Sequence, residues 1–201
     1  SVIGFALTVA FGIVEEKNSR VVEVLLAAVK PRELLAGKVI GLALLGLAQL
    51  LVIAIPGVIA ARLAGTIGLP DATSPALLLT VVVWFLVGYA VYAGVFAAAG
   101  SLVSRQEDLQ TTITPILLVM YGAFVGSLTA SSDPDSLWAH VLTFVPLTAP
   151  MVAPARYARD ALPLAEHLAA LAVTALGAVA LVLLASHIYQ RAILRIGQKV
   201  R

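Results

Sequence analysis

Long apolar stretches separated by short charged ones run along most of the chain. Four runs without a charged residue are long enough to cross a bilayer, because a helical span needs about 20 apolar residues. A shorter apolar run opens the chain. The pattern therefore predicts an all-α, polytopic membrane protein with five transmembrane helices, at about 1–14, 39–61, 76–103, 111–132 and 168–186.

The opening run is too short to span by itself. As a helix, Val2–Val14 would cover about 20 Å, whereas the hydrocarbon core of a bilayer is about 30 Å thick. No basic stretch precedes it, as a signal peptide would require. We interpret it as part of a longer helix. We therefore expect residues 1–201 to be a single transmembrane domain, truncated at the N-terminus, from a protein with six spans.

One further apolar segment contains three prolines. Pro146, Pro150 and Pro154 lie in the run 136–155. Proline removes a backbone donor and bends a helix, and irregular backbone inside a membrane needs protein or water around it. The segment is therefore either an external re-entrant hairpin, at about 136–163, or a badly broken span.

The distribution of basic residues separates these two alternatives. If the segment does not cross, ten of the thirteen Lys and Arg residues share one side of the membrane with the C-terminus. If it crosses, the split falls to eight against five. The positive-inside rule favours the first arrangement, which places the C-terminus in the cytoplasm and the hairpin outside.

The charged stretch 15–38 lies on the predicted cytoplasmic side. Its apolar residues recur at helical spacing from Val22 to Val29, which predicts a short amphipathic helix at about 17–30. This helix is either an ordinary interfacial helix or a lever that presents charge to a cytoplasmic partner. The acidic residues favour the lever, because a helix held only by anionic lipid would gain from Lys and Arg instead.

Composition removes several classes of function. Of the 201 residues, 61% are hydrophobic and only 12% are charged, about half the charged share of an ordinary soluble domain. The absence of cysteine excludes disulfides, thiolate metal sites and a cysteine nucleophile. A net charge of +2 gives no support to nucleic-acid binding. No phosphate-binding loop motif occurs. We therefore expect no ATPase activity in this chain, and no catalytic, cofactor-binding or metal site.

Two groups of residues resemble a known family. The series from Glu15-Glu16-Lys17 through Pro31 to Gly37-Lys38 resembles the coupling-helix region of type-2 ABC exporter permeases. The run Val145–Arg156, together with Ile188–Gly197, is similar to the branch that includes NatB-like sodium-extrusion permeases.

The resemblance implies a permease subunit of an ABC exporter. Such a subunit forms the substrate path, pairs with a second copy or a paralogue, and docks on a separate cytoplasmic ABC ATPase. It implies a multi-pass protein of the bacterial cell membrane that contacts the lipid bilayer, with no cofactor in this chain. By the same resemblance, the residues that couple to the ATPase are Glu15, Glu16, Arg20 and Glu23.

Two further groups of residues are candidates for the transport path. The hairpin would cap or gate the external mouth through Pro146, Pro150 and Arg156. The polar residues Gln49, Thr80, Thr114 and Ser127 lie within spans and could line the path. No charged residue lies inside the five predicted spans, which speaks against an ion-coupled transporter and, less strongly, against sodium as the cargo.

Two alternatives remain open. The chain could be a membrane-embedded enzyme acting on lipid-linked substrates through His140, Arg156, Arg159 and Asp160. It could also be a membrane anchor that recruits cytoplasmic proteins without transport. The sequence leaves open the substrate, the transport direction and whether the dimer is homo- or heteromeric.

Overall fold

All regular structure is helical in the part of the chain that the computed structural model describes, residues 2–18, 31–63, 75–103 and 105–197. Four helices contain a stretch long and apolar enough to cross a membrane. They are α3 (Pro31–Leu63), α4 (Pro75–Leu102), α5 (Gln106–Ser132) and α8 (Leu164–Gly197).

Three helices are shorter. The first, α1 (Val2–Asn18), has 17 residues. The other two, α6 (Leu137–Phe144) and α7 (Ala149–Tyr157), have 8 and 9 residues. The structure thus contains four candidate spans among its described residues, and the fifth stays a prediction. The predicted coupling helix falls mostly on residues 19–30, which lie outside the described residues.

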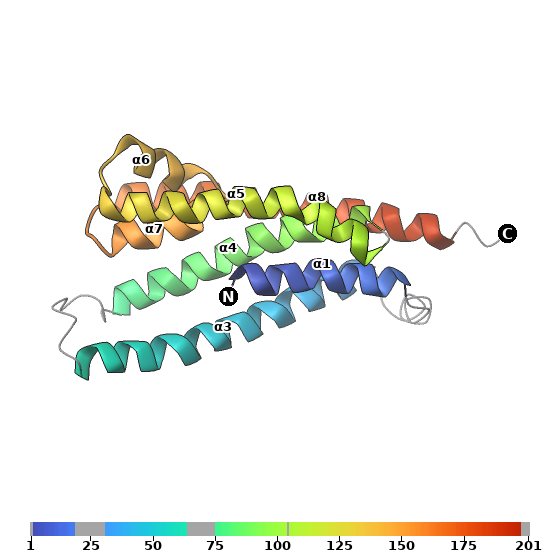
Figure 1. Ribbon diagram of the computed structural model, residues 1–201, viewed down its shortest axis with the longest axis horizontal. Coiled ribbons are helices and arrows are strands. Elements are labelled where there is room, and N and C mark those ends of the chain that lie inside the picture. Colours follow the sequence, from blue (N-terminus) through green and yellow to red (C-terminus); the bar gives the residue numbers. More distant parts are fainter. Residues whose placement is uncertain (1, 19–30, 64–74, 104, 198–201) are drawn as a thin grey trace.

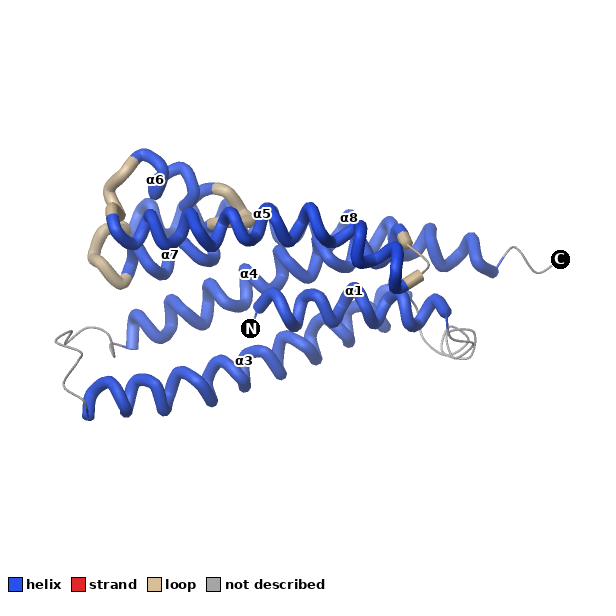
Figure 2. The backbone as a smooth tube through the Cα atoms, in the orientation of Figure 1, coloured by secondary structure: helices blue, strands red, loops and turns tan. Residues whose placement is uncertain are grey.

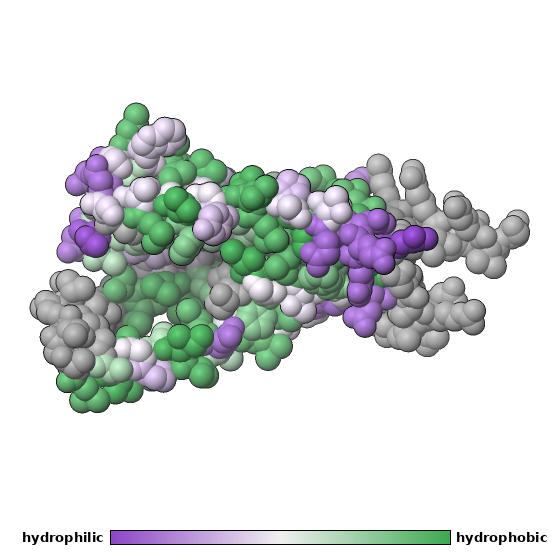
Figure 3. All heavy atoms as spheres, viewed as in Figure 1, coloured by the Kyte–Doolittle hydropathy of each residue, from purple (hydrophilic) through white to green (hydrophobic). Residues whose placement is uncertain are grey.

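The long helices run side by side along the molecule (Figure 1). The end of α5 and the start of α8 lie at one end of the bundle, joined there by α6 and α7, so these two short helices turn back rather than cross (Figure 2). We call this the hairpin end. The end of α1 and the start of α3 lie at the opposite end. Figure 3 shows hydrophilic residues gathered towards both ends and a mostly apolar middle.

Proline and acidic residues mark where several helices begin. Pro31 and Pro75 are the first residues of α3 and α4, positions where the missing N–H costs nothing. Glu107 and Asp108 lie in the first turn of α5, and Glu166 lies in that of α8. Negative charge there is favoured by the helix dipole. The helices extend beyond the predicted charge-free spans, since α3 begins at Pro31 rather than at 39 and α8 begins at Leu164 rather than at 168.

The core of the bundle surrounds α4, which packs mainly on α8 and α1. Large aromatic side chains of α4, including Trp84, Tyr92 and Phe96, are buried. On other faces of α4, glycine residues allow the neighbouring helices to come close. A Cβ atom at Gly94 would lie 3.0 Å from Leu181 Cβ on α8, and one at Gly100 would lie 2.8 Å from the Ala10 carbonyl oxygen on α1. Such close contact matters in lipid, where apolar burial between helices gives little driving force and packing supplies most of it.

Helix α3 is far less enclosed. Only 6% of its most apolar stretch is buried. Gly46 lies against Phe5 of α1 and Phe85 of α4, whereas most residues of α3 after it are exposed. Gly37 and Gly41, a small-residue pair four apart, face open space in the described structure. The first half of α3 is therefore packed against protein on one side only, and its second half is mostly exposed.

We predict that Gly100→Ala destabilises the bundle by about 1–3 kcal/mol, because the added methyl group would press on the α1 backbone and overpack the contact. Gly122→Ala is the matched control, since nothing lies within 4 Å of a Cβ there. That substitution should leave the melting temperature unchanged or raise it. Thermal unfolding of the two variants and the wild type in the same detergent measures both effects on stability. Equal effects at the two positions would contradict the packing described for Gly100.

Candidate functional site

The proline-rich segment folds as two short helices with a turn between them. Ser136 caps α6, its hydroxyl accepting a bond from the Ala139 N–H at 3.3 Å. Helix α6 ends at Phe144, and the next residue, Val145, has the extended backbone that is favoured before a proline. The Thr148 hydroxyl donates to the Leu142 carbonyl oxygen at 2.6 Å and closes the turn. Pro150 then lies in the first turn of α7, where proline is tolerated.

Two of the predicted gate residues, Pro146 and Pro150, pack this hairpin against α8 and α4. A Cβ atom at Gly88 of α4 would lie 2.5 Å from Pro150 Cβ, and one at Gly177 of α8 would lie 3.0 Å from Pro146 Cγ. Each proline ring therefore lies directly on a glycine surface. The Tyr92 hydroxyl of α4 also donates to the Leu147 carbonyl oxygen at 2.6 Å. The hairpin is thus packed between α4 and α8 at its turn.

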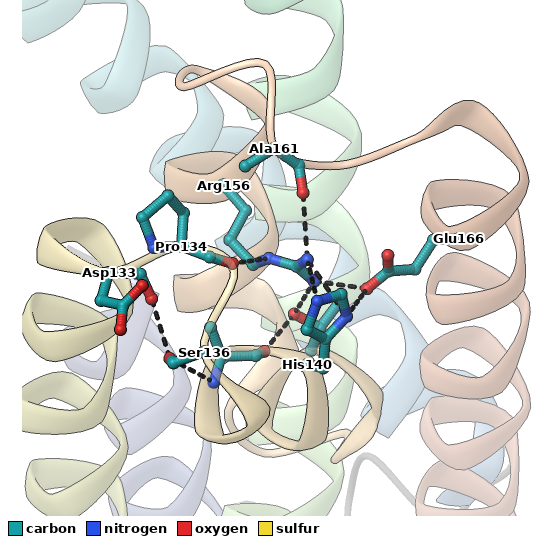
Figure 4. Close-up of polar contacts among 9 residues, drawn as sticks. Asp133, Pro134, Ser136, His140, Arg156, Ala161 and Glu166 are labelled. Carbon is teal, nitrogen blue, oxygen red and sulfur yellow. Dashed lines mark hydrogen bonds and ion pairs between the residues drawn. The ribbon is translucent and has the colours of Figure 1, made fainter.

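The third predicted gate residue, Arg156, is fully buried and lies at the centre of the hairpin (Figure 4). Its Nε donates to the Pro134 carbonyl oxygen at 2.8 Å and one Nη2 hydrogen goes to the Ala161 carbonyl oxygen at 3.0 Å. Its Nη1 donates to Thr143 Oγ1 at 3.0 Å and to the Glu166 carboxylate. The remaining Nη2 hydrogen faces the His140 ring, whose nitrogens lie 3.2 and 3.3 Å away. A guanidinium has five N–H groups, and every one of them has a partner.

The partners of Arg156 come from different parts of the chain. They lie on the α5–α6 turn, α6, the α7–α8 loop and the first turn of α8. His140 Nδ1 also lies 3.0 Å from Glu166 Oε1, which fits an Nδ1–H tautomer donating to the carboxylate. A buried cation is tolerated only when it is paired and hydrogen-bonded. This cluster meets both conditions, so Arg156 joins the hairpin to α8. We call Arg156, Glu166, His140 and Thr143 the Arg156 cluster.

Sequence reasoning identified Arg156 but missed Glu166 and Thr143. Glu166 is the last acidic residue before the charge-free run of α8, and Arg156 is the first basic residue after the apolar, proline-rich run 136–155. An acidic and a basic residue at the same end of the predicted spans indicate an ion pair, and the sequence contained this signal. Arg159 and Asp160, grouped with Arg156 and His140 as candidate reactive groups, are exposed, and Arg159 meets Arg156 through its backbone N–H, which donates to the Arg156 carbonyl oxygen at 3.1 Å. Trp84 donates to His167 Nε2 at 3.1 Å, and Tyr157 meets the His167 ring edge-on.

The predicted path residues do not form one group. Thr80 and Ser127 are buried, and Gln49 and Thr114 are exposed. Ser127 donates to the Phe124 carbonyl oxygen and Thr114 to that of Gln110, both at 2.7 Å, so these hydroxyls bond to their own helix. Thr114 alone of the four borders a cleft of about 430 Å³ between α5, Ile3 of α1 and Met151 of α7. Its lining is almost wholly apolar.

The predicted coupling residues divide into two pairs. Arg20 and Glu23 lie outside the described residues. Glu15 is exposed near the end of α1. Glu16 instead turns inward and forms an ion pair with Lys38 of α3, with Nζ and Oε1 2.5 Å apart. Lys38 reaches it across Gly12, where an added Cβ would lie 2.5 Å from Nζ. Within the described residues, no group of three or more His, Asp or Glu side chains could hold a metal ion.

A family model described as "ABC-2 family transporter protein" matches residues 1–186, nearly the whole chain. The chain belongs to the ABC-2 transporter family. Together with the four candidate spans, this makes it a multi-pass membrane protein and confirms the broad resemblance to type-2 ABC permeases. The NatB-like branch stays a prediction.

Two curated relatives resemble this ABC-2 family member. It is 31% identical to "Uncharacterized protein YhaP" of Bacillus subtilis over 207 residues, covering 98% of this chain and 49% of the relative. It is 29% identical to "Uncharacterized protein MJ1024" of Methanocaldococcus jannaschii, covering 77% of this chain and 37% of the relative. The chain therefore spans at most about half the length of these relatives. No solved structure matches it significantly.

We predict that Glu166→Gln lowers the stability of this ABC-2 protein by about 3 kcal/mol, because it leaves the buried Arg156 without its carboxylate. Arg156→Lys should be as harmful, since an ammonium cannot reproduce the planar set of donors. Arg159→Gln is the control and should change stability by less than about 0.5 kcal/mol. Thermal unfolding and limited proteolysis of the hairpin report the effect. A Glu166→Gln variant as stable as Arg159→Gln would contradict the cluster.

A second prediction concerns the end of α7. Asp160 has a φ of 55°, and its N–H bonds to the Tyr157 carbonyl oxygen while the Ala161 N–H bonds to that of Arg156, each at 3.1 Å. This pattern is a Schellman motif with an aspartate where glycine is preferred. Asp160→Gly should therefore raise stability by up to about 1 kcal/mol. Asp160→Ala should lower it, and a lower melting temperature for the glycine variant would contradict the left-handed conformation.

Proposed function

We propose that this chain is the transmembrane part of a permease subunit in an ABC exporter, coupled to ATP hydrolysis by a separate cytoplasmic ATPase. The observation that carries this proposal is the ABC-2 family match over residues 1–186. The ABC-2 family implies association with an ABC ATPase. The bundle fits the role because its four candidate spans leave both ends hydrophilic, so that one end can meet the ATPase and the other the far side of the membrane.

The cargo we propose is amphiphilic and mainly apolar. The cleft bordered by Thr114 has apolar walls formed by α5, Ile3 and Met151. A charged solute would lose its hydration there without gaining a partner. Thr114 is therefore the best supported of the four path candidates, while Gln49, Thr80 and Ser127 lack a shared cavity with it in the described residues. Sodium as the cargo gains no support from these walls.

The ATPase would meet the end of the bundle where α1 ends and α3 begins. Glu15 is the described coupling candidate with an exposed side chain, so it is the residue we propose to touch the ATPase. Glu16 has an internal partner in Lys38. We therefore propose for Glu16 a positioning role, in which it holds α1 to α3 beside the ATPase contact. Arg20 and Glu23 remain coupling candidates by resemblance.

The hairpin would form the gate at the far end of the path. Pro146 and Pro150 pack on α8 and α4, and Arg156 links the hairpin to Glu166 of α8. Movement of α8 against α4 would thus move the hairpin with it. We further propose that the hairpin end faces outward, the C-terminus faces the cytoplasm of a bacterial cell, and the subunit works as a dimer. The enzyme alternative is weaker, because Arg156 has no N–H group left for a substrate.

The test is transport by the full-length protein, co-expressed with the ABC ATPase encoded beside it and reconstituted in vesicles. The probes are a fluorescent uncharged amphiphile and a fluorescent phospholipid. We expect ATP-dependent flux of at least one probe. Glu15→Lys should weaken ATPase binding roughly fivefold, the effect of losing about 1 kcal/mol at an exposed ion pair. Glu107→Lys, at another exposed acidic residue, should not.

Two results would count against the proposal. The first is a wild-type protein that never associates with an ABC ATPase. The second is flux that persists without ATP. The double exchange Glu16→Lys with Lys38→Glu separates the two roles at the cytoplasmic end. If Glu16 only positions α1, the exchange restores the flux that Glu16→Lys alone removes.

A further inference from the structure

Helix α6 turns an apolar face away from the bundle. On its inner side Ala139 and Thr143 are buried, and Leu142 contacts α5 at Gly126. On its outer side five large apolar residues recur at helical spacing and are exposed: Leu137, Trp138, Val141, Phe144 and Val145. Trp138 is 73% exposed and Leu137 79%. A continuous apolar face of this kind indicates that something covers it.

The depth of α6 identifies what covers it. Leu142 packs on Gly126, and α5 continues for six residues to Ser132, about 9 Å at 1.5 Å per residue. The turn that follows carries Asp133 and Asp135, both exposed. Because α6 runs back from this turn beside α5, Trp138 lies between the charged turn and the level of Gly126. That is the depth at which a membrane meets water, and tryptophan is enriched there.

The neighbouring helix continues the same surface. Helix α8 packs beside α6, and its first turns expose Leu164 and Leu168. The polar side chains of α6 point the other way, since His140 and Thr143 bond within the Arg156 cluster. The apolar face of α6 thus adjoins a span that itself faces lipid, and its polar face is already occupied by protein.

We propose that the outer face of α6 is a lipid-contacting anchor, with Trp138 at the membrane–water interface of the leaflet at the hairpin end. The occupant is the bilayer, not a second copy of the chain or a further protein. Because Arg156 ties α6 to α7 and α8, this anchor fixes the depth of the whole hairpin. The inference needs only that the long helices span a membrane, and it is independent of any transport activity.

The chain offers a direct test because it has two tryptophans, Trp84 and Trp138. Trp84 is buried and bonded to His167, so it serves as an internal reference. The protein is placed in nanodiscs of phosphatidylcholine brominated either near the top of the acyl chains or near their ends. The emission of Trp138 is the difference between wild type and Trp138→Phe, which avoids disturbing Trp84.

We expect the shallow bromines to quench Trp138 roughly twofold more than the deep ones, as an interfacial ring requires. Trp84 should respond little to either. A depth control comes from Val141→Trp in the Trp138→Phe protein. Val141 lies one turn further along the same exposed face, away from the charged turn, so this tryptophan should shift towards the deep quencher.

Three outcomes would overturn the proposal. Quenching of Trp138 by aqueous iodide but not by brominated lipid would place α6 in water. Protection from both quenchers would mean that a second copy or another part of the protein covers the face. Stronger quenching by the deep bromines than by the shallow ones would place α6 inside the hydrocarbon rather than at its edge.

Discussion

The bundle depends on close contact between α4 and its neighbours. In lipid, apolar side chains gain little by leaving a solvent as apolar as themselves, so helices associate where their surfaces fit. Helix α4 provides that fit with a glycine on each of three contacts. Gly100 meets α1, Gly94 meets α8 and Gly88 meets the hairpin through Pro150. Its buried aromatic residues fill the space between these contacts. Where such a surface is lacking, as along the second half of α3, the helices separate.

The Arg156 cluster follows a different rule. A glycine contact requires a small residue but no particular hydrogen-bonding group. A buried guanidinium instead requires a hydrogen-bond acceptor for each of its N–H groups. All of its N–H groups are satisfied by four segments that the chain brings together only after α5, α6, α7 and α8 are in place. A half-formed cluster would leave a buried charge unpaired, at a cost of several kcal/mol. The cluster therefore favours one arrangement of the hairpin and penalises near alternatives.

The parts of the fold that the sequence predicted are those set by local chemistry. Apolar length predicted helices at about 76–103 and 111–132, where α4 and α5 lie, because lipid requires such runs to be helical, although α5 begins five residues earlier. Prolines predicted that the segment after α5 is broken, and the distribution of basic residues favoured a segment that does not cross. Contacts between residues that are distant in the sequence were harder to predict. The ion pair between Glu16 and Lys38 is an example, because nothing in the pattern of 15–38 shows that Lys38 folds back across Gly12. The four path residues were chosen by polarity alone, and two of them, Thr114 and Ser127, bond to their own helices.

The uneven enclosure of α3 has a consequence for how the protein responds to its membrane. The charge-free part of α3, residues 39–61, has 23 residues, about 35 Å as a helix and longer than the roughly 30 Å hydrocarbon core. A mismatch of this size is relieved by tilting. Protein holds α3 near Lys38 and Gly46 but not beyond, so bilayer thickness sets the angle of its free half. The thickness of the membrane therefore acts on the same helix that carries Lys38, and this protein is expected to work differently in thin and thick bilayers.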